Sequence, residues 1–531
     1  MRIAPRPLLL AALVAAAPLA AQDGRTRAER TGYRETTRYA EVVELMEAAD
    51  RASPRVHLTR MGYTTEGRSI PLAVVGRVPD ASARAVRASG KTVVYLQGNI
   101  HAGEVEGKEA LLVLLRELAA GRHAAWTDSL VLLVAPIYNA DGNERVTLTS
   151  RPHQTGPVGG QGQRPNAQGL DLNRDHTKIG TPEARSLLAM IREYDPHVLV
   201  DLHTTNGTFH GYHLTYAPPL HPNTDAGITR MLRDEWLPAV TRAMKTRHGR
   251  DLFHYGNVPD PESPWAAARG AERGWYTFDH RPRFSNNYAG LRNRFAILSE
   301  AYAYLPFDQR IAVTGEFVGG LLDWARAHAT PIRRATEAAD RRSVAGETLA
   351  LTARVRRGDR PLDILMGAVD TLRHPYTGEM MMRRRDVSRV ERMADFSTFA
   401  AAETAVAPAA WLVPAGLAEV AERLTAHGVS FERLAAPARM TVEEFRIDST
   451  RVGEPFQGHR ERRVWGRYVA TEREIPAGTL RVPAAQPLGR LAFTLLEPGS
   501  DDGLLNWNVL DAALERSPGA YPITRVAARR D

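Results

Sequence analysis

The sequence predicts an α/β fold in which a mixed, mostly parallel sheet is covered by helices on both faces and is followed by a β-rich region. Three continuous apolar runs, at residues 92–100, 130–137 and 197–203, have the length and composition of strands that are buried on both faces. Helical patterns at residues 107–120 and 182–194 lie between these runs. Buried strands that alternate with helices are typical of sheets covered on both sides, so these observations together define the fold class.

Further elements extend this pattern toward both ends of the α/β region. Before the first apolar run, the expected elements are a helix at residues 35–52 and strands near 56–58 and at 70–75. After the last run, they are a helix at 225–245, a strand at 294–302 and a helix at 308–328. Residues 156–168 are rich in Gly, Pro and Gln, which predicts an irregular loop.

The character of the sequence changes near residue 330. Pro331 and the charged stretch 333–342 predict a linker, and short strand-like runs separated by Pro and Gly follow it. One β-α-β-like unit interrupts these runs, at residues 410–413, 417–427 and 429–431. The chain of 531 residues is longer than one core requires, so we expect an α/β domain at 35–330 and a β-rich accessory domain at 341–531. The sequence does not indicate what the second domain does.

Residues 1–21 have the composition of a secretory signal peptide. Arg2 and Arg6 precede an apolar run at 8–21 that is too short to span a bilayer, and a polar segment follows Ala21. The chain contains no Cys, so disulfides are excluded. We therefore expect an exported bacterial protein, periplasmic or secreted, without a membrane anchor.

The net charge of +8 arises from 69 basic and 61 acidic side chains. The basic residues, nearly all of them Arg, are scattered along the chain and interleaved with Asp and Glu. No basic stripe is visible, which argues against nucleic acid as a partner. The oligomeric state is not indicated.

Three potential metal ligands follow predicted strands. His101 and Glu104 lie in the motif Gly-Asn-Ile-His-Ala-Gly-Glu, directly after the first apolar run, and His203 ends the run at 197–203. The carboxyl ends of strands are where open α/β sheets place their sites. Two imidazoles and a carboxylate are ligands of a catalytic zinc that keeps one position for water. Taken singly, His-x-x-Glu recurs by chance, and a lone His at a strand end is more often structural.

Two further features have a chemical interpretation. Asn173 and Arg174 present an amide and a guanidinium together, which suits a planar carboxylate, although an isolated Asn-Arg pair is usually a surface dipeptide. Glu300 lies inside the apolar strand pattern at 294–302, where a carboxylate is costly to bury unless it has a partner or a task. Accepting a proton from a metal-activated water is such a task.

These residues, in this order, resemble the zinc carboxypeptidase family, the relatives of carboxypeptidases A and B, over about residues 37–329. The resemblance implies that His101, Glu104 and His203 bind one zinc ion per chain. It also implies that Glu300 is the catalytic Glu, which accepts a proton from the attacking water and passes it to the leaving amine.

The same resemblance implies roles for the segment around the Asn-Arg pair. Asn173 and Arg174 match the family's binding site for the substrate carboxylate, and Asp171 matches the Asp that orients the first ligand His. Arg164 fits best the Arg that polarises the scissile carbonyl, with Arg151 as the second choice.

Three departures from the family pattern concern substrate binding. Gly103 replaces an Arg that is often found between the first His and Glu, and Thr205 replaces a Tyr two residues after the third ligand. The mobile Tyr that closes over the substrate has no clear counterpart; Tyr288 and Tyr276 are the candidates. The residue preferred at the cleaved end depends on a side chain somewhere in 275–291 and is not determined.

The resemblance implies a zinc metallocarboxypeptidase whose partner is a peptide with a free C-terminal carboxylate. One alternative is a zinc amidohydrolase that acts on murein peptides or acylated amino acids, since the same ligands would serve and only the pocket would differ. The other alternative is a non-catalytic binding protein on the same scaffold. The presence of all three ligands and Glu300 argues against it.

Overall fold

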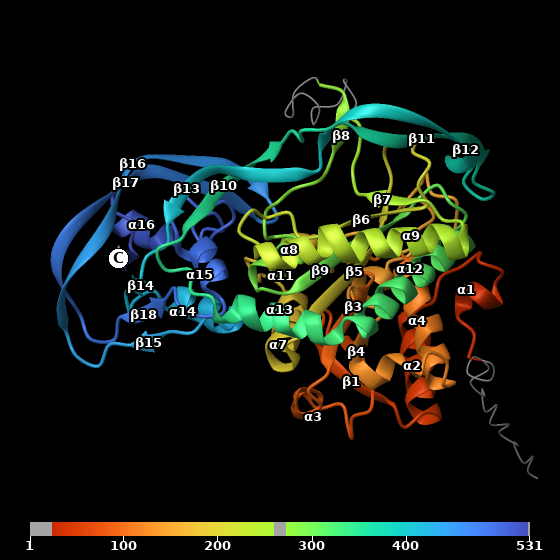
Figure 1. The fold of residues 1–531 in the computed structure, drawn as a ribbon, viewed down its shortest axis with the longest axis horizontal. Coiled ribbons are helices and arrows are strands. Elements are labelled where there is room, and N and C mark those ends of the chain that lie inside the picture. The colour runs from red at the N-terminus through yellow and green to blue at the C-terminus, as the bar shows by residue number, and fades with distance from the viewer. Residues whose placement is uncertain (1–23, 260–271, 529–531) are drawn as a thin grey trace, which may run out of the picture.

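The computed structural model describes residues 24–259 and 272–528; the predicted signal peptide at 1–21 lies outside these residues. The α/β region is built on an eight-stranded sheet with the order β1-β2-β4-β3-β5-β9-β6-β7 (Figure 1). Its neighbours β4, β3, β5 and β9 are mutually parallel, whereas β1, β2 and β6 introduce antiparallel pairs. The strands are β1 Val56–Tyr63, β2 Ser69–Val75, β3 Thr92–Gly98, β4 Leu130–Ala135, β5 Val198–Thr205, β6 Leu214–Ala217, β7 Leu252–His254 and β9 Phe295–Tyr302.

Helices cover both faces of this sheet because successive side chains of a strand point to opposite sides. In β3, Val94 and Leu96 join a core with residues of α2, α4 and α12, whereas Val93 and Tyr95 join a second core with residues of α3 and α7. The predicted fold class is therefore confirmed. The helices of this region are α1 Arg27–Arg30, α2 Tyr39–Ala52, α3 Ala83–Ala88, α4 Glu106–Ala119, α5 Trp126–Ser129, α6 Ala140–Glu144, α7 Pro182–Tyr194, α11 Ser285–Leu291 and α12 Phe307–Ala327.

The helix predicted at 225–245 is present and has a π-helical middle turn. It comprises α8 Ala226–Arg230, the π segment Met231–Trp236 and α9 Leu237–His248. The loop predicted at 156–168 contains no helix and no named strand.

The linker predicted at 333–342 is wrong, because this stretch belongs to helix α13, Ala329–Arg341. Pro331 sits in the first turn, where no intrahelical N–H bond is lost. Ile332, Thr336 and Ala339 recur at helical spacing and are buried, and the helix packs against β3 and α8. The charged residues occupy the outer face of an amphipathic helix.

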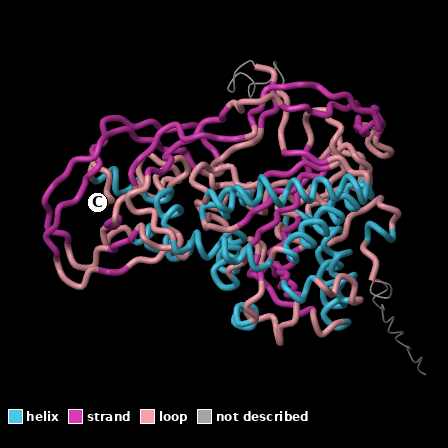
Figure 2. Tube along the Cα trace, in the orientation of Figure 1, coloured by secondary structure: helices cyan, strands magenta, loops and turns pink. Residues whose placement is uncertain are grey.

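The C-terminal region is rich in strands, many of them in long two-stranded ribbons (Figure 2). Its strands are β10 Thr348–Arg356, β11 Leu362–Arg373, β12 Met380–Phe396, β13 Thr398–Val406, β14 Ala410–Val413, β15 Glu432–Arg433, β16 Ala438–Phe456, β17 His459–Ile475, β18 Leu480–Pro483 and β19 Thr524–Val526. Its helices are α14 Ala418–His427, α15 Gly489–Leu496 and α16 Asp511–Arg516. The strand predicted at 429–431 is wrong, since the next strand, β15, begins at Glu432.

The two halves of the chain are joined by a strand pairing and by a common hydrophobic cluster. Strand β8 (Gly274–Tyr276) of the α/β half pairs in parallel with β12, and the ribbon β11–β12 runs along the top of the view in Figure 1. A hydrophobic cluster joins Ile179, Leu188 and Tyr288 to Trp411 and Phe493 of the C-terminal half. The C-terminal region is therefore packed onto helices α7 and α11 of the α/β half.

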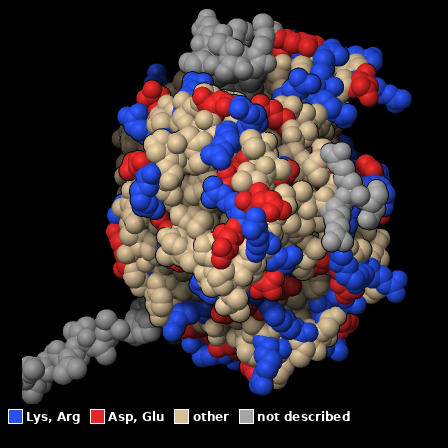
Figure 3. All heavy atoms as spheres, turned by 90° about the vertical axis from the view of Figure 1, so that its left-hand side faces the viewer, with Lys and Arg blue, Asp and Glu red and all other residues tan. Residues whose placement is uncertain are grey.

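Acidic and basic side chains are interspersed on the face formed by the C-terminal strands (Figure 3). Between residues 24 and 259 and between 272 and 528, no helix has the length and hydropathy needed to cross a membrane.

Helix α13 provides a test of the packing. Ile332 is fully buried, so Ile332→Ala removes core contacts and leaves a cavity, and we expect the free energy of unfolding to fall by about 2–5 kcal/mol. Arg334→Ala, on the exposed side of the same helix, should change it by less than about 0.5 kcal/mol. Urea denaturation followed by tryptophan fluorescence measures both; equal effects would contradict this packing.

Candidate active site

The candidate site lies at the carboxyl ends of three neighbouring parallel strands, β3, β5 and β9. His203 near the end of β5 is in register with Glu300 of β9. His101 follows β3 by three residues, and a turn closed by a hydrogen bond from the Glu104 N–H to the His101 carbonyl (2.8 Å) brings Glu104 beside it. Strand pairing alone therefore collects residues that are about 200 positions apart in the chain.

Gly103, which stands where the family often has an Arg, is explained by close packing. A Cβ at this position would lie 2.8 Å from the carbonyl oxygen of Gly162 and 3.1 Å from Nε of Arg151. The loop predicted at 156–168 thus closes tightly over the turn that carries the two ligands, and no larger side chain fits without displacement.

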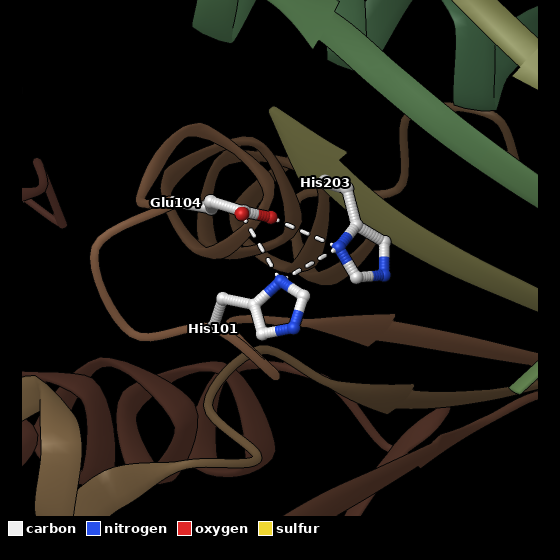
Figure 4. Close-up of side chains that lie close together, drawn as sticks. All are labelled: His101, Glu104 and His203. Carbon is white, nitrogen blue, oxygen red and sulfur yellow. Dashed lines mark hydrogen bonds and ion pairs between the residues drawn. The ribbon is translucent and has the colours of Figure 1, made fainter. Parts of the chain in front are cut away.

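The side chains of His101, Glu104 and His203 point toward a common centre (Figure 4). Nδ1 of His101 lies 3.0 Å from Oε1 of Glu104, Nδ1 of His203 lies 2.9 Å from Oε2 of Glu104, and the two Nδ1 atoms are 3.2 Å apart. Each residue is only 3% exposed. Ligand atoms about 2.0–2.1 Å from a tetrahedral zinc are about 3.3 Å from one another, so this group has the donor types and the spacing of a zinc site.

Two carboxylates hold the outer nitrogens of the imidazoles. Nε2 of His101 lies 3.0 Å from Oδ1 of Asp171, and Nε2 of His203 lies 2.9 Å from Oδ2 of Asp201. This pairing leaves each Nδ1 facing the centre, as a metal ligand requires. Burial opposes ionisation of Asp201, but His203 and the hydroxyl of Ser285 hold its pKa below the ordinary value.

Asp201 is a site residue that the sequence reasoning missed. It precedes His203 by two residues on β5, so both side chains lie on the same face of the strand. That period-two spacing was a usable signal. Gln97 Nε2 and Ser285 Oγ also donate to its carboxylate, at 3.1 and 2.6 Å, which fixes it further.

The structure brings both candidate arginines to the metal-ligand group. Arg164 donates to Oδ2 of Asp171 through Nε (3.0 Å) and Nη2 (2.8 Å) and lies 3.6 Å from Glu104, with 42% of its side chain exposed. Arg151, the second choice, donates to Oε1 of Glu104 at 2.7 Å and is 16% exposed. Arg164 is thus the more exposed of the two arginines.

Glu300 stands beside the ligand group with one free carboxylate oxygen. Its Oε2 is buried and has no hydrogen-bond partner among the described residues. Burial, opposed by His203 and reinforced by the negative charge of Glu104, raises the pKa of Glu300 to about 8. An unpartnered carboxylate oxygen next to a metal-ligand group is placed to accept and return a proton.

Asn173 and Arg174 lie in the short 3-10 helix η1, Leu172–Arg174, next to His203. Oδ1 of Asn173 accepts from the Ser285 N–H at 2.9 Å, and its Nδ2 lies 3.5 Å from Nε2 of His203. The Arg174 guanidinium stacks 4.0 Å from the Phe284 ring and lines a cleft of about 910 Å³. Aromatic side chains dominate the apolar lining of this cleft: Phe209, Tyr255, Tyr276, Phe278 and Phe284.

The structure does not place Tyr288 in this cleft. Tyr288 is 1% exposed within the hydrophobic cluster shared with the C-terminal region, and its hydroxyl is 2.8 Å from Nδ1 of His427. Its suggested role over the substrate is therefore wrong in this geometry. Tyr276 and Tyr255 both line the cleft; Tyr255, which no sequence motif pointed to, has its pKa raised to about 12 by burial and by Glu300.

Two imidazoles and a carboxylate that converge at the carboxyl edge of an α/β sheet have the donor types found in metal-dependent hydrolases. Comparison with known proteins adds that residues 42–289 match the zinc carboxypeptidase family model. The protein is accordingly a peptide-bond hydrolase of the carboxypeptidase class. The match ends before β9, so Glu300 lies outside it.

Individual relatives extend the similarity into the C-terminal half. Carboxypeptidase 2 of Trichophyton rubrum is 23% identical over 482 residues, which cover 87% of this chain and 81% of that protein. Carboxypeptidase D of Mus musculus is 27% identical over 39% of this chain and 17% of its own length. Among solved structures, a metallo-carboxypeptidase from Burkholderia cenocepacia aligns over 55% of this chain and 70% of its own, at 16% identity and a TM-score of 0.40. Carboxypeptidase A of Helicoverpa armigera aligns over 58% and 75%, with 16% identity and a TM-score of 0.40.

The carboxylates behind the imidazoles give a test of the metal group. Asp201→Asn removes the charge that orients His203, and we expect zinc affinity to fall about 10- to 100-fold. Asp359→Asn, at an exposed position outside the ligand group, should leave it unchanged. Competition with a chromophoric chelator measures the affinities. Wild-type affinity in the Asp201 variant would contradict the orienting role.

Proposed function

We propose that the protein is a zinc-dependent metallocarboxypeptidase that hydrolyses the C-terminal peptide bond of peptides, with one zinc ion per chain held by His101, Glu104 and His203. The observation that carries this proposal is the convergence of the three residues: the two Nδ1 atoms lie 3.2 Å apart, each is within 3.0 Å of one oxygen of Glu104, and Glu300 lies on the adjacent strand. When bound, zinc lowers the pKa of a water molecule and polarises the scissile carbonyl.

Glu300 acts as the general base in this proposal. Its free oxygen accepts the proton of the attacking water, and the same oxygen returns the proton to the leaving amine. Burial raises the pKa of Glu300, and a metal cation in the ligand group would lower it again. The Glu300 carboxylate would then be ionised when the substrate arrives. Arg164, with Arg151 behind it, stabilises the oxyanion, a contribution of about 3–4 kcal/mol for one well-placed donor.

Asn173 and Arg174 hold the terminal carboxylate of the substrate. The Arg174 guanidinium lines the cleft, where the Phe284 ring supports its face, and Nη1 donates to the Asn173 carbonyl at 2.7 Å. A peptide held there by its carboxylate places its last peptide bond, and no internal bond, next to the metal ligands. This restriction is what makes the enzyme a carboxypeptidase.

We propose that the catalytic domain spans residues 35–330, that residues 341–531 are a β-rich second domain, and that residues 1–21 direct export from a bacterial cell. The composition of the first 21 residues supports export.

Cleavage of a mixed peptide library by the mature protein tests the function. Each peptide is supplied with a free or an amidated C-terminus, with zinc or with a chelator, and the products are read by mass spectrometry. We expect zinc-dependent loss of single C-terminal residues from the free acids only. Cleavage of murein peptides or acylated amino acids alone would move the assignment to an amidohydrolase, and zinc binding without any cleavage would favour a binding protein.

Replacement of the general base isolates its role. Glu300→Gln keeps the shape of the side chain but cannot accept the proton, so kcat should fall at least about 100-fold while the zinc content stays at one per chain. Glu474→Gln, on an exposed strand, is the matched control. Zinc is measured by mass spectrometry of the metal. Substantial residual turnover would exclude Glu300 as the base.

A further inference from the structure

The tip of a C-terminal hairpin reaches the loop that carries Asp171. Strands β16 and β17 are joined by the two-residue turn Gln457-Gly458, since Phe456 pairs with His459 across it. Oε1 of Gln457 accepts a hydrogen bond from the backbone N–H of Asp171 at 2.8 Å, across 286 positions in the chain. The hairpin therefore contacts the residue that orients the ligand His101.

Gln457 is an unusual residue for this turn. Gln457 and Gly458 have φ angles of 51° and 78°, so both positions are left-handed. Turns of this kind favour Asn-Gly, and Gln is rare in that conformation. Asn would suit the turn better, but its side chain is one methylene shorter and would not reach Asp171. Gln457 is therefore long enough to make the contact with Asp171, although Gln seldom adopts the backbone conformation that this turn requires.

The remainder of the loop after Asp171 is also held by the C-terminal region. Trp507 Nε1 donates to Oγ1 of Thr177 at 3.2 Å, and Arg423 donates to the carbonyls of Lys178 (2.6 Å) and Ile179 (2.8 Å). Ile179 is buried and has a φ of 45°, a conformation that a β-branched residue adopts only when its surroundings impose it. These contacts fix the loop in one shape.

The segment on the other side of Asn173 is held in the same way. The Ser285 N–H that donates to Asn173 follows Arg283 by two residues. The Arg283 guanidinium donates to Oδ1 of Asp502 at 2.9 Å and to Oε1 of Glu461 at 2.6 Å. It also lies over the ring of Phe456 at the hairpin tip, 5.1 Å from the ring centroid. Both segments around the carboxylate-binding pair are therefore anchored on the C-terminal region.

We propose that Gln457 is a positioning residue for the substrate-carboxylate site, through which the C-terminal region sets the geometry of the Asp171–Arg174 segment. The inference rests on the proposed roles of Asn173 and Arg174. It gives the β-rich region a function in substrate binding: the hairpin tip fixes the backbone at Asp171, and the two residues that hold the substrate follow within one turn of helix.

Gln457→Asn separates this role from hairpin stability, because Asn fits the turn and loses the contact. We expect KM for a cleaved peptide to rise about three- to tenfold with kcat unchanged, as for the loss of one hydrogen bond that supports ground-state binding. Hydrogen exchange of the full-length, metal-free protein should show faster exchange across residues 171–174, while the urea midpoint stays at or above the wild-type value.

Two further variants make the result specific. Gln457→Glu keeps the length and an acceptor oxygen and should retain slow exchange at Asp171, whereas Arg451→Ala, exposed on the same hairpin, should match the wild type in every readout. Unchanged KM and unchanged exchange in Gln457→Asn would overturn the proposal. If the wild type cleaves no peptide, the proposed function fails, and the exchange data alone still decide whether Gln457 positions the loop.

Discussion

Several ionisable groups are buried together at one edge of the parallel sheet, and their charges must be compensated there. Glu104, Asp171, Asp201 and Glu300 surround two imidazoles, and the three ligand residues are almost fully buried. Carboxylates removed from water are costly unless each has a counter-charge or hydrogen-bond donors. Arg151, Arg164 and the imidazoles supply part of that compensation, and a divalent cation between the ligand atoms would supply the rest.

The strands and the loops supply different parts of this buried group. Strands β5 and β9 present His203 and Glu300 in fixed register, because their apolar side chains are locked between helices on both faces. The loops supply Arg151, Arg164 and Asp171, which complete the charge balance. Loops have no ladder of hydrogen bonds to hold them, so their geometry has to be set by tertiary contacts.

Much of the fold was readable in the sequence because its decisive elements are apolar throughout. Strands β3, β5 and β9 stand out since both of their faces are buried, and α7 has the predicted bounds, residues 182–194. Helix α13 was mistaken for a linker because its charged face outweighs its narrow buried stripe of Ile332, Thr336 and Ala339. In that case the helical spacing was a better guide than the composition.

The strand pattern predicted the site residues that lie at or near strand ends, whereas Arg151, Arg164 and Asp171, which lie in loops, were reached through the family resemblance. His101, Glu104, His203 and Glu300 come together because strand neighbours in a parallel sheet end at the same edge. Tyr288 lies near the site in sequence, but which face of its helix turns inward depends on His427, 139 positions away. The contact of Gln457 with Asp171 is beyond sequence reasoning for the same reason, since nothing local encodes a partner 286 positions away.

Asp171 joins the candidate metal-ligand group to the residues proposed to bind the substrate carboxylate. Its carboxylate contacts Nε2 of His101, receives two bonds from Arg164 and accepts the Asn173 N–H at 2.9 Å, while its own N–H donates to Gln457. Moving the loop would break several charge-assisted bonds at once, and these are the stronger kind. A site held in this way is formed before substrate arrives, so the entropy of ordering it is lost on folding and does not weaken substrate binding. The C-terminal region thus contributes to substrate binding by pre-organising the site, although none of its described residues belongs to the candidate metal-ligand group.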